Sequence, residues 1–278
     1  MCLIAFAINA SARWPLVVAS NRDEFYDRPT QPLAQWQTTS GQEIISGRDA
    51  RAGGTWLGAS PEGRVAFLTN VREPGRAPGL SSRGELITHW LEGRGPAEEF
   101  TARLVKSAAG YSGFNLILGD FQCSAWTWLT NRSTASASGW HAQQLPAGVY
   151  GLSNASLDTP WPKTIELKRV LSAALLQAKT NDDLQELLWL ALARRAPGPP
   201  ASFLQKNFLQ AMEDAKATAF VDFPGHAYGT RSSTVLLVSR PPASPRMVGH
   251  RLEIHERTHR FSSCEKTSLA FSFRDVVN

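Results

Sequence analysis

Two hydrophobic periodicities alternate along this chain, and their order restricts the folds that it can adopt. Up to residue 70 the sequence consists mainly of short apolar runs bounded by turn-forming residues, beginning at 2–9 and 15–20, which are typical of β-strands. Helical sequence is expected at 82–93 and 96–108, and strands resume from 113 to 154. A one-sided stripe of leucine and alanine with helical spacing then precedes the C-terminal strands.

This order predicts layers of strands and helices rather than a repeated strand–helix–strand unit. Runs of strands that alternate with pairs of helices are characteristic of α+β folds. Because the strands are strongly apolar, both faces of each sheet need to be covered. We therefore predict a four-layer αββα sandwich of two antiparallel sheets flanked by helices, in a single domain over residues 1–278. Thr180 and Asp183 have the spacing of a capping box at the start of one helix.

Charge and cysteine content narrow the class of protein further. The net charge is +5, from 29 basic and 24 acidic residues, but the basic residues are scattered and form no block of the kind that binds nucleic acid. They suit the mouth of a pocket for a small apolar molecule with an anionic group. Three cysteines lack pairing or metal-ligand spacing, and neither an export signal nor an apolar stretch of about 20 residues is present. We expect a cytoplasmic protein with no membrane span and no metal site.

Cys2 has two interpretations that differ in their chemistry. Free cysteine is commonly buried, and Cys2 can be simply a small apolar residue at the start of a strand. If Met1 is removed, Cys2 instead carries both a thiol and a free α-amine. The pKa of an α-amine is roughly 7.7–8.0 and that of a thiol about 8.5. Such an amine can take the thiol proton during nucleophilic attack and return it to a leaving group.

Four polar residues, Asn21 to Glu24, directly follow the second apolar run. A hairpin would bring the end of this strand back beside Cys2. Because side chains alternate along a strand, Asn21 and Asp23 would face one way and Arg22 and Glu24 the other. One pair is expected to point at Cys2 while the other anchors the loop.

Other strand ends carry residues that are able to bind or activate a substrate. The Gly53–Gly54 pair precedes Trp56 and is expected to allow close backbone approach or a positive φ. Asn70 and Asn154 stand at strand ends, where an asparagine amide can cap a turn or donate to an oxyanion. Arg231 lies just before an apolar strand, where a lone arginine can hold a carboxylate or a phosphate.

Taken in order, several segments resemble the NRDE family, also called the transport and Golgi organisation family. They are MCLIAFA, NRDEFYDRPT, GRDARAGGTWLG, LTNVR, SRGEL, YSGFNLILGD, YGLSNASLDTPWPK and YGTRSSTVLL. The resemblance extends from residue 1 to about 237. It implies an αββα fold similar to that of the N-terminal nucleophile (Ntn) hydrolases. It also links Cys2 with the cysteine branch of those enzymes, which includes penicillin V acylases and bile salt hydrolases.

The resemblance further implies roles for individual residues. That branch supports its cysteine with an arginine and an aspartate on the second strand, two asparagines and a later arginine. The corresponding positions in this chain are Arg22 and Asp23, Asn70 and Asn154, and Arg231. The branch separates its arginine from its aspartate, whereas here the two are adjacent, so a regular strand cannot turn both toward Cys2. Either the strand has ended by Asn21, or Asn21 and Asp23 take these roles.

Two functions from different classes fit these predictions. In the first, an Ntn-type cysteine hydrolase cleaves an amide or thioester bond of a small molecule, an asparagine amide stabilises the oxyanion, and no cofactor is required. We expect Asn21, Glu24, Trp56 and Arg72 to contact the substrate. In the second, which the family's association with lipid, acyl-CoA and haem homeostasis implies, the same fold binds or traffics haem or an acyl-CoA-like lipid without catalysis.

Overall fold

Two antiparallel sheets form the centre of the computed structural model, which describes residues 2–73, 75, 77–195, 208–240, 249–260 and 263–274. The first sheet has the order β10-β1-β2-β12-β13-β14, with β11 paired to β12, and the second runs from β3 to β9 in chain order. The first sheet consists of β1 (Cys2–Ile8), β2 (Leu16–Phe25), β10 (Gly148–Leu152), β11 (Asp222–Phe223), β12 (Tyr228–Ser239), β13 (His250–Arg260) and β14 (Ser263–Phe273). The second consists of β3 (Thr30–Gln37), β4 (Glu43–Asp49), β5 (Leu57–Ala59), β6 (Arg64–Asn70), β7 (Phe114–Asp120), β8 (Ala125–Thr130) and β9 (His141–Gln144).

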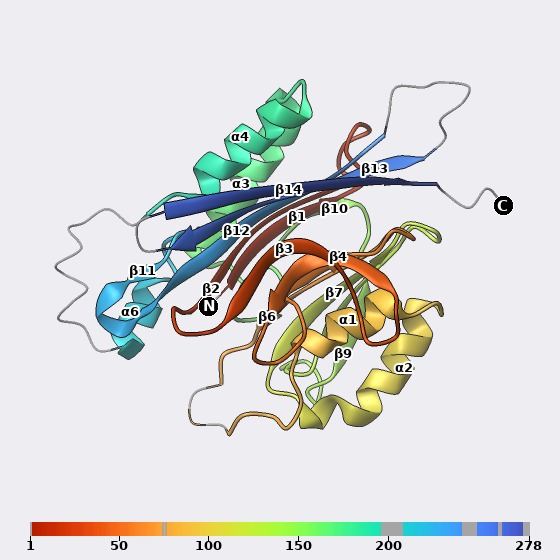
Figure 1. The fold of residues 1–278 in the computed structure, drawn as a ribbon. Helices are drawn as coiled ribbons and strands as arrows, with labels where there is room; N and C mark the ends of the chain where they lie inside the picture. The colour runs from red at the N-terminus through yellow and green to blue at the C-terminus, as the bar shows by residue number, and fades with distance from the viewer. Residues whose placement is uncertain are drawn as a thin grey trace.

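Helices cover the outer face of each sheet (Figure 1). Helices α3 (Pro162–Gln177) and α4 (Asn181–Leu192) pack on the first sheet, and α1 (Gly84–Glu92) and α2 (Ala97–Ser107) pack on the second. Shorter helices are η1 (Ala108–Gly110), α6 (Phe208–Asp214) and η2 (Pro224–His226). The arrangement is the predicted four-layer αββα sandwich, so the fold prediction is confirmed.

Strand β1 shows how the apolar sequence produces this layering. Its even-numbered residues from Ile4 to Ile8 belong to the core between the two sheets. Its odd-numbered residues from Leu3 to Ala7 belong to the core between the first sheet and helices α3 and α4. Both faces of the strand are therefore buried, which explains why its sequence is continuously apolar instead of alternating.

The predicted capping box begins α4. The Asp183 N–H donates to Thr180 Oγ1 at 3.1 Å, and the Thr180 N–H donates to the Asp183 carboxylate at 3.0 Å. These two bonds satisfy backbone donors that the first turn of a helix leaves without partners.

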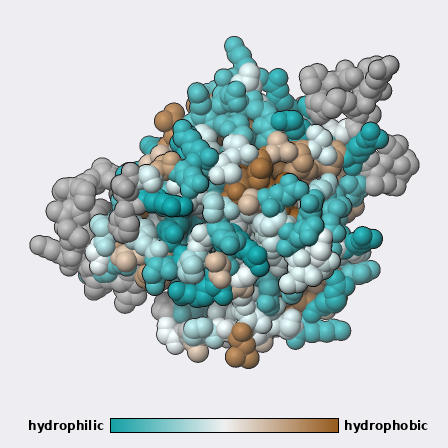
Figure 2. All heavy atoms as spheres, viewed as in Figure 1, coloured by the Kyte–Doolittle hydropathy of each residue, from teal (hydrophilic) through white to brown (hydrophobic). Residues whose placement is uncertain are grey.

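The surface visible in Figure 2 is mostly hydrophilic, with a hydrophobic patch near the centre of the view. Within the part of the chain that the structure describes, no helix combines the length and the apolar character needed to cross a membrane.

Candidate functional site

The predicted hairpin brings the polar segment of β2 to Cys2. Strands β1 and β2 pair antiparallel with Cys2 directly opposite Arg22. Opposed residues of such a pair share one face of the sheet, so Cys2, Arg22 and Glu24 are on the side that faces the second sheet. Since β2 continues to Phe25, the strand has not ended by Asn21.

Asn21 lies on the opposite face and is fully buried. Its side-chain Nδ2 donates to the carbonyl oxygens of Leu192 at 2.9 Å and Ala219 at 2.8 Å. Asn21 thus ties β2 to the end of α4 and to the segment that precedes β11. The structure places it outside the pocket that Cys2 lines, contrary to the expected substrate contact.

Asp23 shares the face of Asn21 and nevertheless reaches Cys2. It is the first residue beyond the pairing of Cys2 with Arg22, and it lines the same pocket. Thr230 Oγ1 donates to its Oδ1 at 2.7 Å. Burial raises the pKa of the Asp23 carboxyl, while the charge of Lys163, the Thr230 bond and Arg22 act in the opposite direction.

Burial is also the main influence on the Cys2 thiol, and it raises the thiol pKa. The negative charge of Asp23 raises this pKa further. The positive charge of Arg22 and a hydrogen bond from the Asp23 backbone N–H lower it. The adjacent residues Arg22 and Asp23 therefore act on the same sulfur with opposite signs.

A cavity of about 650 Å³ opens beside Cys2. The predicted site residues that line it are Cys2, Arg22, Asp23, Glu24, Trp56 and Asn70. The Arg22 guanidinium lies over the Trp56 ring, 4.3 Å from its centroid, and forms ion pairs with Glu24 at 3.7 Å and Asp49 at 4.0 Å. Stacking on the ring orients this buried cation beside the thiol.

Four charged residues that the sequence analysis did not assign also line this cavity, namely Arg28, Asp49, Arg51 and Arg83. Arg28 and Asp49 form an ion pair at 2.8 Å. Burial lowers the pKa of Arg83, and the charges of Cys2, Glu24 and Glu73 oppose this shift. Apart from Arg83, these residues belong to the segments NRDEFYDRPT and GRDARAGGTWLG, so the available signal was the charge pattern inside those segments.

The two adjacent glycines show the positive φ and the close backbone approach that the sequence predicts. Gly53 has φ +78°, a backbone conformation that residues other than glycine rarely adopt. A Cβ on Gly54 would collide with the backbone of Gly84 at the start of α1. This close approach places the following residues, including Trp56, against the cavity.

The two predicted asparagines have different surroundings. Asn154 Oδ1 accepts a hydrogen bond from the Cys2 backbone nitrogen at 3.2 Å, and Asn154 Nδ2 donates to the Asn70 carbonyl at 2.8 Å. Ser153 Oγ donates to the Cys2 carbonyl at 2.7 Å. The side chain of Asn70 lines the cavity and has no hydrogen-bond partner among the described residues. Asn154 is thus engaged with the backbone of Cys2, whereas Asn70 lines the cavity.

The structure does not bring Arg231 or Arg72 to Cys2. Arg231 Nη1 donates to the carbonyl oxygens of Phe25 at 2.8 Å, Tyr26 at 3.0 Å and Arg28 at 3.3 Å, and its side chain lines a separate cavity of about 500 Å³. Arg72 forms an ion pair with Glu213 at 2.8 Å. Neither residue lines the cavity of Cys2.

Lys163 ends the segment YGLSNASLDTPWPK, and no pattern in the sequence indicates a role for it. The structure buries it in the first turn of α3, where the charges of Asp23 and Cys2 act on it. No group of three or more His, Cys, Asp or Glu side chains within the described ranges could hold a metal ion.

Fold and site together define a class of protein: a four-layer αββα sandwich with a cysteine at the head of a central strand, set in a charged pocket. Comparison with known families identifies the particular one. The chain belongs to the family described as Transport and Golgi organisation 2, whose family model matches residues 1–259. The resemblance inferred from the sequence segments is thereby confirmed.

Similar proteins include the Transport and Golgi organization protein 2 homolog of Homo sapiens, 33% identical over 263 residues, and the protein of that name from Drosophila melanogaster, 25% identical over 260 residues. Each alignment covers 86% of this chain and 88% of the relative. Among solved structures, a Caenorhabditis elegans N-acylethanolamine-hydrolyzing acid amidase ortholog is 14% identical with a TM-score of 0.41, covering 84% of this chain and 92% of that one. A conjugated bile acid hydrolase from Clostridium perfringens is 8% identical with a TM-score of 0.44 and 99% coverage of both chains. The fold assignment of this protein depends on its own sheet topology.

Proposed function

We propose that this protein is an Ntn-type cysteine hydrolase that cleaves an amide or thioester bond of a small molecule, with Cys2 as the nucleophile after removal of Met1. Met1 itself lies outside the described residues. One observation carries the proposal. The Cys2 backbone nitrogen, which becomes the α-amine when Met1 is removed, donates a hydrogen bond to Asn154 Oδ1 at 3.2 Å. Cys2 itself lines a cavity of about 650 Å³.

Each group of the site has a part in the proposed reaction. The α-amine of Cys2 takes the thiol proton, and the sulfur attacks the carbonyl carbon of the substrate. The amide of Asn70, a residue of the cavity lining, donates to the oxyanion, since Asn154 is already bonded to Cys2 and to the Asn70 carbonyl. The amine then returns the proton to the leaving nitrogen or sulfur. Water attacks the resulting acyl-thioester, and the free thiol is restored.

The lining of the cavity supports an acyl substrate that carries an anionic group. Arg28, Arg51 and Arg83 contribute positive charge, and Trp56 and Leu68 contribute apolar surface. Arginine binds carboxylate and phosphate through paired N–H donors. We propose that the scissile carbonyl lies at Cys2 while the anionic group of the substrate is bound by these arginines.

The second candidate function is binding or traffic of haem or an acyl-CoA-like lipid without catalysis. The specific observation in its favour is the combination of these arginines with Leu80, which lines the cavity and is 99% exposed. No histidine is among the described residues that line the cavity, so Cys2 would supply the axial ligand of a bound haem.

Intact-mass spectrometry of native protein is the first test, because retention of Met1 in most molecules would contradict the hydrolase proposal. The second test measures hydrolysis of acyl-amide and acyl-thioester panels by wild type, Cys2→Ala and Cys123→Ala. We expect Cys2→Ala to lose turnover by at least about 10³-fold while it still binds substrate. Cys123→Ala is the matched control, since Cys123 is exposed and lies outside the cavity. Absence of turnover together with a haem Soret band that Cys2→Ala shifts would favour the binding function.

A further inference from the structure

Lys163 occupies a position that is unfavourable for a cation in two respects. It is the second residue of α3, close to the positive end of the helix dipole. Only 2% of its surface is exposed, and its Nζ has no hydrogen-bond partner among the described residues. A buried ammonium without hydrogen bonds costs free energy of folding. The stability of the fold therefore does not explain the presence of this lysine.

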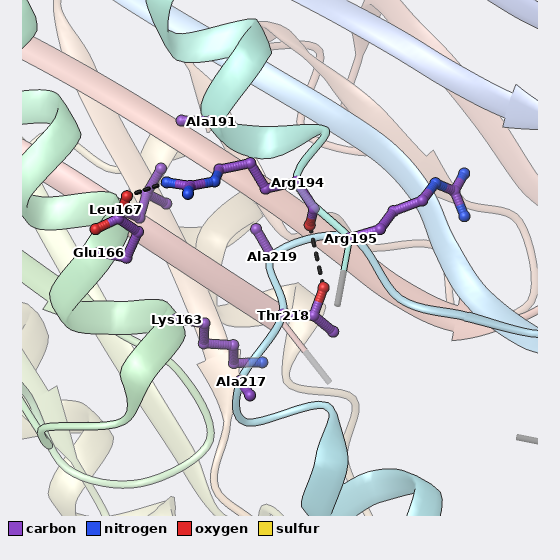
Figure 3. Close-up of a pocket in the computed structure, with 9 residues that line it drawn as sticks. All are labelled: Lys163, Glu166, Leu167, Ala191, Arg194, Arg195, Ala217, Thr218 and Ala219. Carbon is purple, nitrogen blue, oxygen red and sulfur yellow. Dashed lines mark hydrogen bonds and ion pairs between the residues drawn. The ribbon is translucent and has the colours of Figure 1, made fainter. Parts of the chain in front are cut away.

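Lys163 lies on α3, which packs on the face of the first sheet that carries Asn21 and Asp23. It lines a cavity of about 170 Å³ together with Ala219, whose carbonyl accepts the Asn21 hydrogen bond. In Figure 3 it lies beside Ala217 and below Arg194 and Glu166, which form an ion pair with each other. Its Nζ lies 5.9 Å from the centroid of the Trp161 ring. Burial lowers the pKa of Lys163, and the opposing influences are the charges of Asp23 and Cys2.

We propose that Lys163 is a positioning residue of the Cys2 site, which acts from the helical side of the first sheet to hold Asp23 and the Cys2 thiolate in their charged forms. This inference rests on the proposed function. The physical reason is reciprocity: when Asp23 and Cys2 favour the protonated lysine, the protonated lysine favours the carboxylate and the thiolate by the same free energy. Lys163 thus opposes the effect of burial, which favours the neutral forms of both groups.

The described charged side chains that interact with Cys2 come from three segments. Asp23 and Arg22 lie on β2, Arg83 precedes α1, and Lys163 lies on α3. Of these four residues, Lys163 alone belongs to the helical layer that covers the first sheet. Replacing Lys163 changes the charge on the helical face of the first sheet and leaves the residues that line the Cys2 cavity unchanged.

The test measures the pH dependence of Cys2 alkylation by iodoacetamide, followed by mass spectrometry. The background carries Cys123→Ser and Cys264→Ser, because both residues are exposed and would react. We expect Lys163→Met to raise the apparent pKa of the thiol by about one unit and to slow alkylation about tenfold below that pKa. Lys163→Arg should restore part of the rate, since it returns the positive charge.

Lys216→Met is the matched control. The Lys216 Nζ lies 5.0 Å from the same Trp161 ring, but it is partly exposed and pairs with Glu213. We expect its alkylation profile to equal that of the background protein. Thermal melts identify any variant that fails to fold, and Lys163→Gln replaces Lys163→Met in that case.

The two proposals fail in different ways. Alkylation of Cys2 needs no turnover. If the protein hydrolyses no substrate but Lys163→Met still changes the pKa of the Cys2 thiol, only the hydrolase proposal is rejected. An alkylation profile that Lys163→Met and Lys163→Gln leave unchanged would overturn the role of Lys163, whether or not the protein hydrolyses a substrate.

Discussion

The two faces of β2 between Asn21 and Glu24 carry similar polar groups in different surroundings. On the face toward the second sheet, Arg22 and Glu24 line a cavity open to solvent. Arg22 stacks on the Trp56 ring and forms an ion pair with Glu24. On the face toward α3 and α4, Asn21 and Asp23 are buried and bonded to backbone carbonyls or to Thr230. The first face is suited to meet a ligand, whereas the second is a polar part of the core from which Asp23 also reaches the cavity beside Cys2.

This difference shows that a run of polar residues at the end of a strand can have two separate purposes. Residues on the buried face must have defined partners, because an unsatisfied polar group there costs free energy. Residues on the cavity face can leave part of their bonding capacity for a ligand. Substitutions on the buried face should therefore change stability, and those on the cavity face should change binding and turnover.

The largest effect on stability is expected at Asn21. Asn21→Leu removes both donors to the Leu192 and Ala219 carbonyls, which should lower the free energy of unfolding by about 2 kcal/mol. Asn21→Asp should cost more, because it keeps the shape but directs a carboxylate at two carbonyl oxygens. Urea denaturation measures both variants. Equal stability of Asn21→Leu and wild type would show that the buried face needs no defined partners.

Asp23 and Glu24 allow the same substitution chemistry to be compared on the two faces. The folded-state pKa of Asp23 is raised, so its stabilising contribution is fully present below its unfolded pKa of about 3.9 and is lost as pH rises through the folded-state value. Asp23→Asn cannot ionise and escapes this loss. The variant should therefore gain stability relative to wild type as pH rises from about 4 toward the folded-state pKa of Asp23.

Glu24→Gln is the matched variant on the cavity face, where the Glu24 side chain is partly exposed. Chemical denaturation at several pH values compares the two variants. Asp23→Asn should also lower the pKa of the Cys2 thiol, since the negative charge of Asp23 raises it. A parallel pH response of the two variants would break the distinction between the faces.

The sequence was sufficient for the layers and for the central hairpin, because both depend on local patterns. Apolar runs, turn residues and helical spacing determine which segments become strands and helices. The capping box of α4 and the positive φ of Gly53 likewise follow from a few neighbouring residues. Alternation correctly separated Asn21 and Asp23 from Arg22 and Glu24.

Features that depend on tertiary packing could not be predicted in the same way. Lys163 meets Asp23 and Cys2 only because α3 packs across the first sheet. The direction of Arg231 depends on an irregularity in the pairing of β12 with β2, where the register shifts between Thr230 and Ser232. Alternation alone also could not show that Asp23, just beyond the paired end of β1, acts on Cys2 from the other face.

A smaller effect on stability is expected at Arg22, and a matched pair elsewhere in the chain isolates its cause. Arg22 lies 4.3 Å from the Trp56 ring centroid, and Arg48 lies 4.5 Å from that of Trp36. Lysine does not reproduce the planar stacking of arginine, so Arg22→Lys should cost about 1 kcal/mol of unfolding free energy at its buried position. Arg48→Lys should cost less than about 0.5 kcal/mol, because its pair is more exposed to water.

Binding gives these two variants a sharper contrast than stability does. Arg22 lines the cavity of Cys2 and Arg48 does not, so only Arg22→Lys should weaken the binding of an anionic acyl ligand, measured by calorimetry in the Cys2→Ala background. We expect about a tenfold loss, which corresponds to about 1.4 kcal/mol. If both variants lose stability equally and neither loses affinity, Arg22 is a packing residue like Arg48. The cavity face of β2 would then differ from the buried face in exposure alone, and ligand recognition would have to come from Arg28, Arg51 and Arg83.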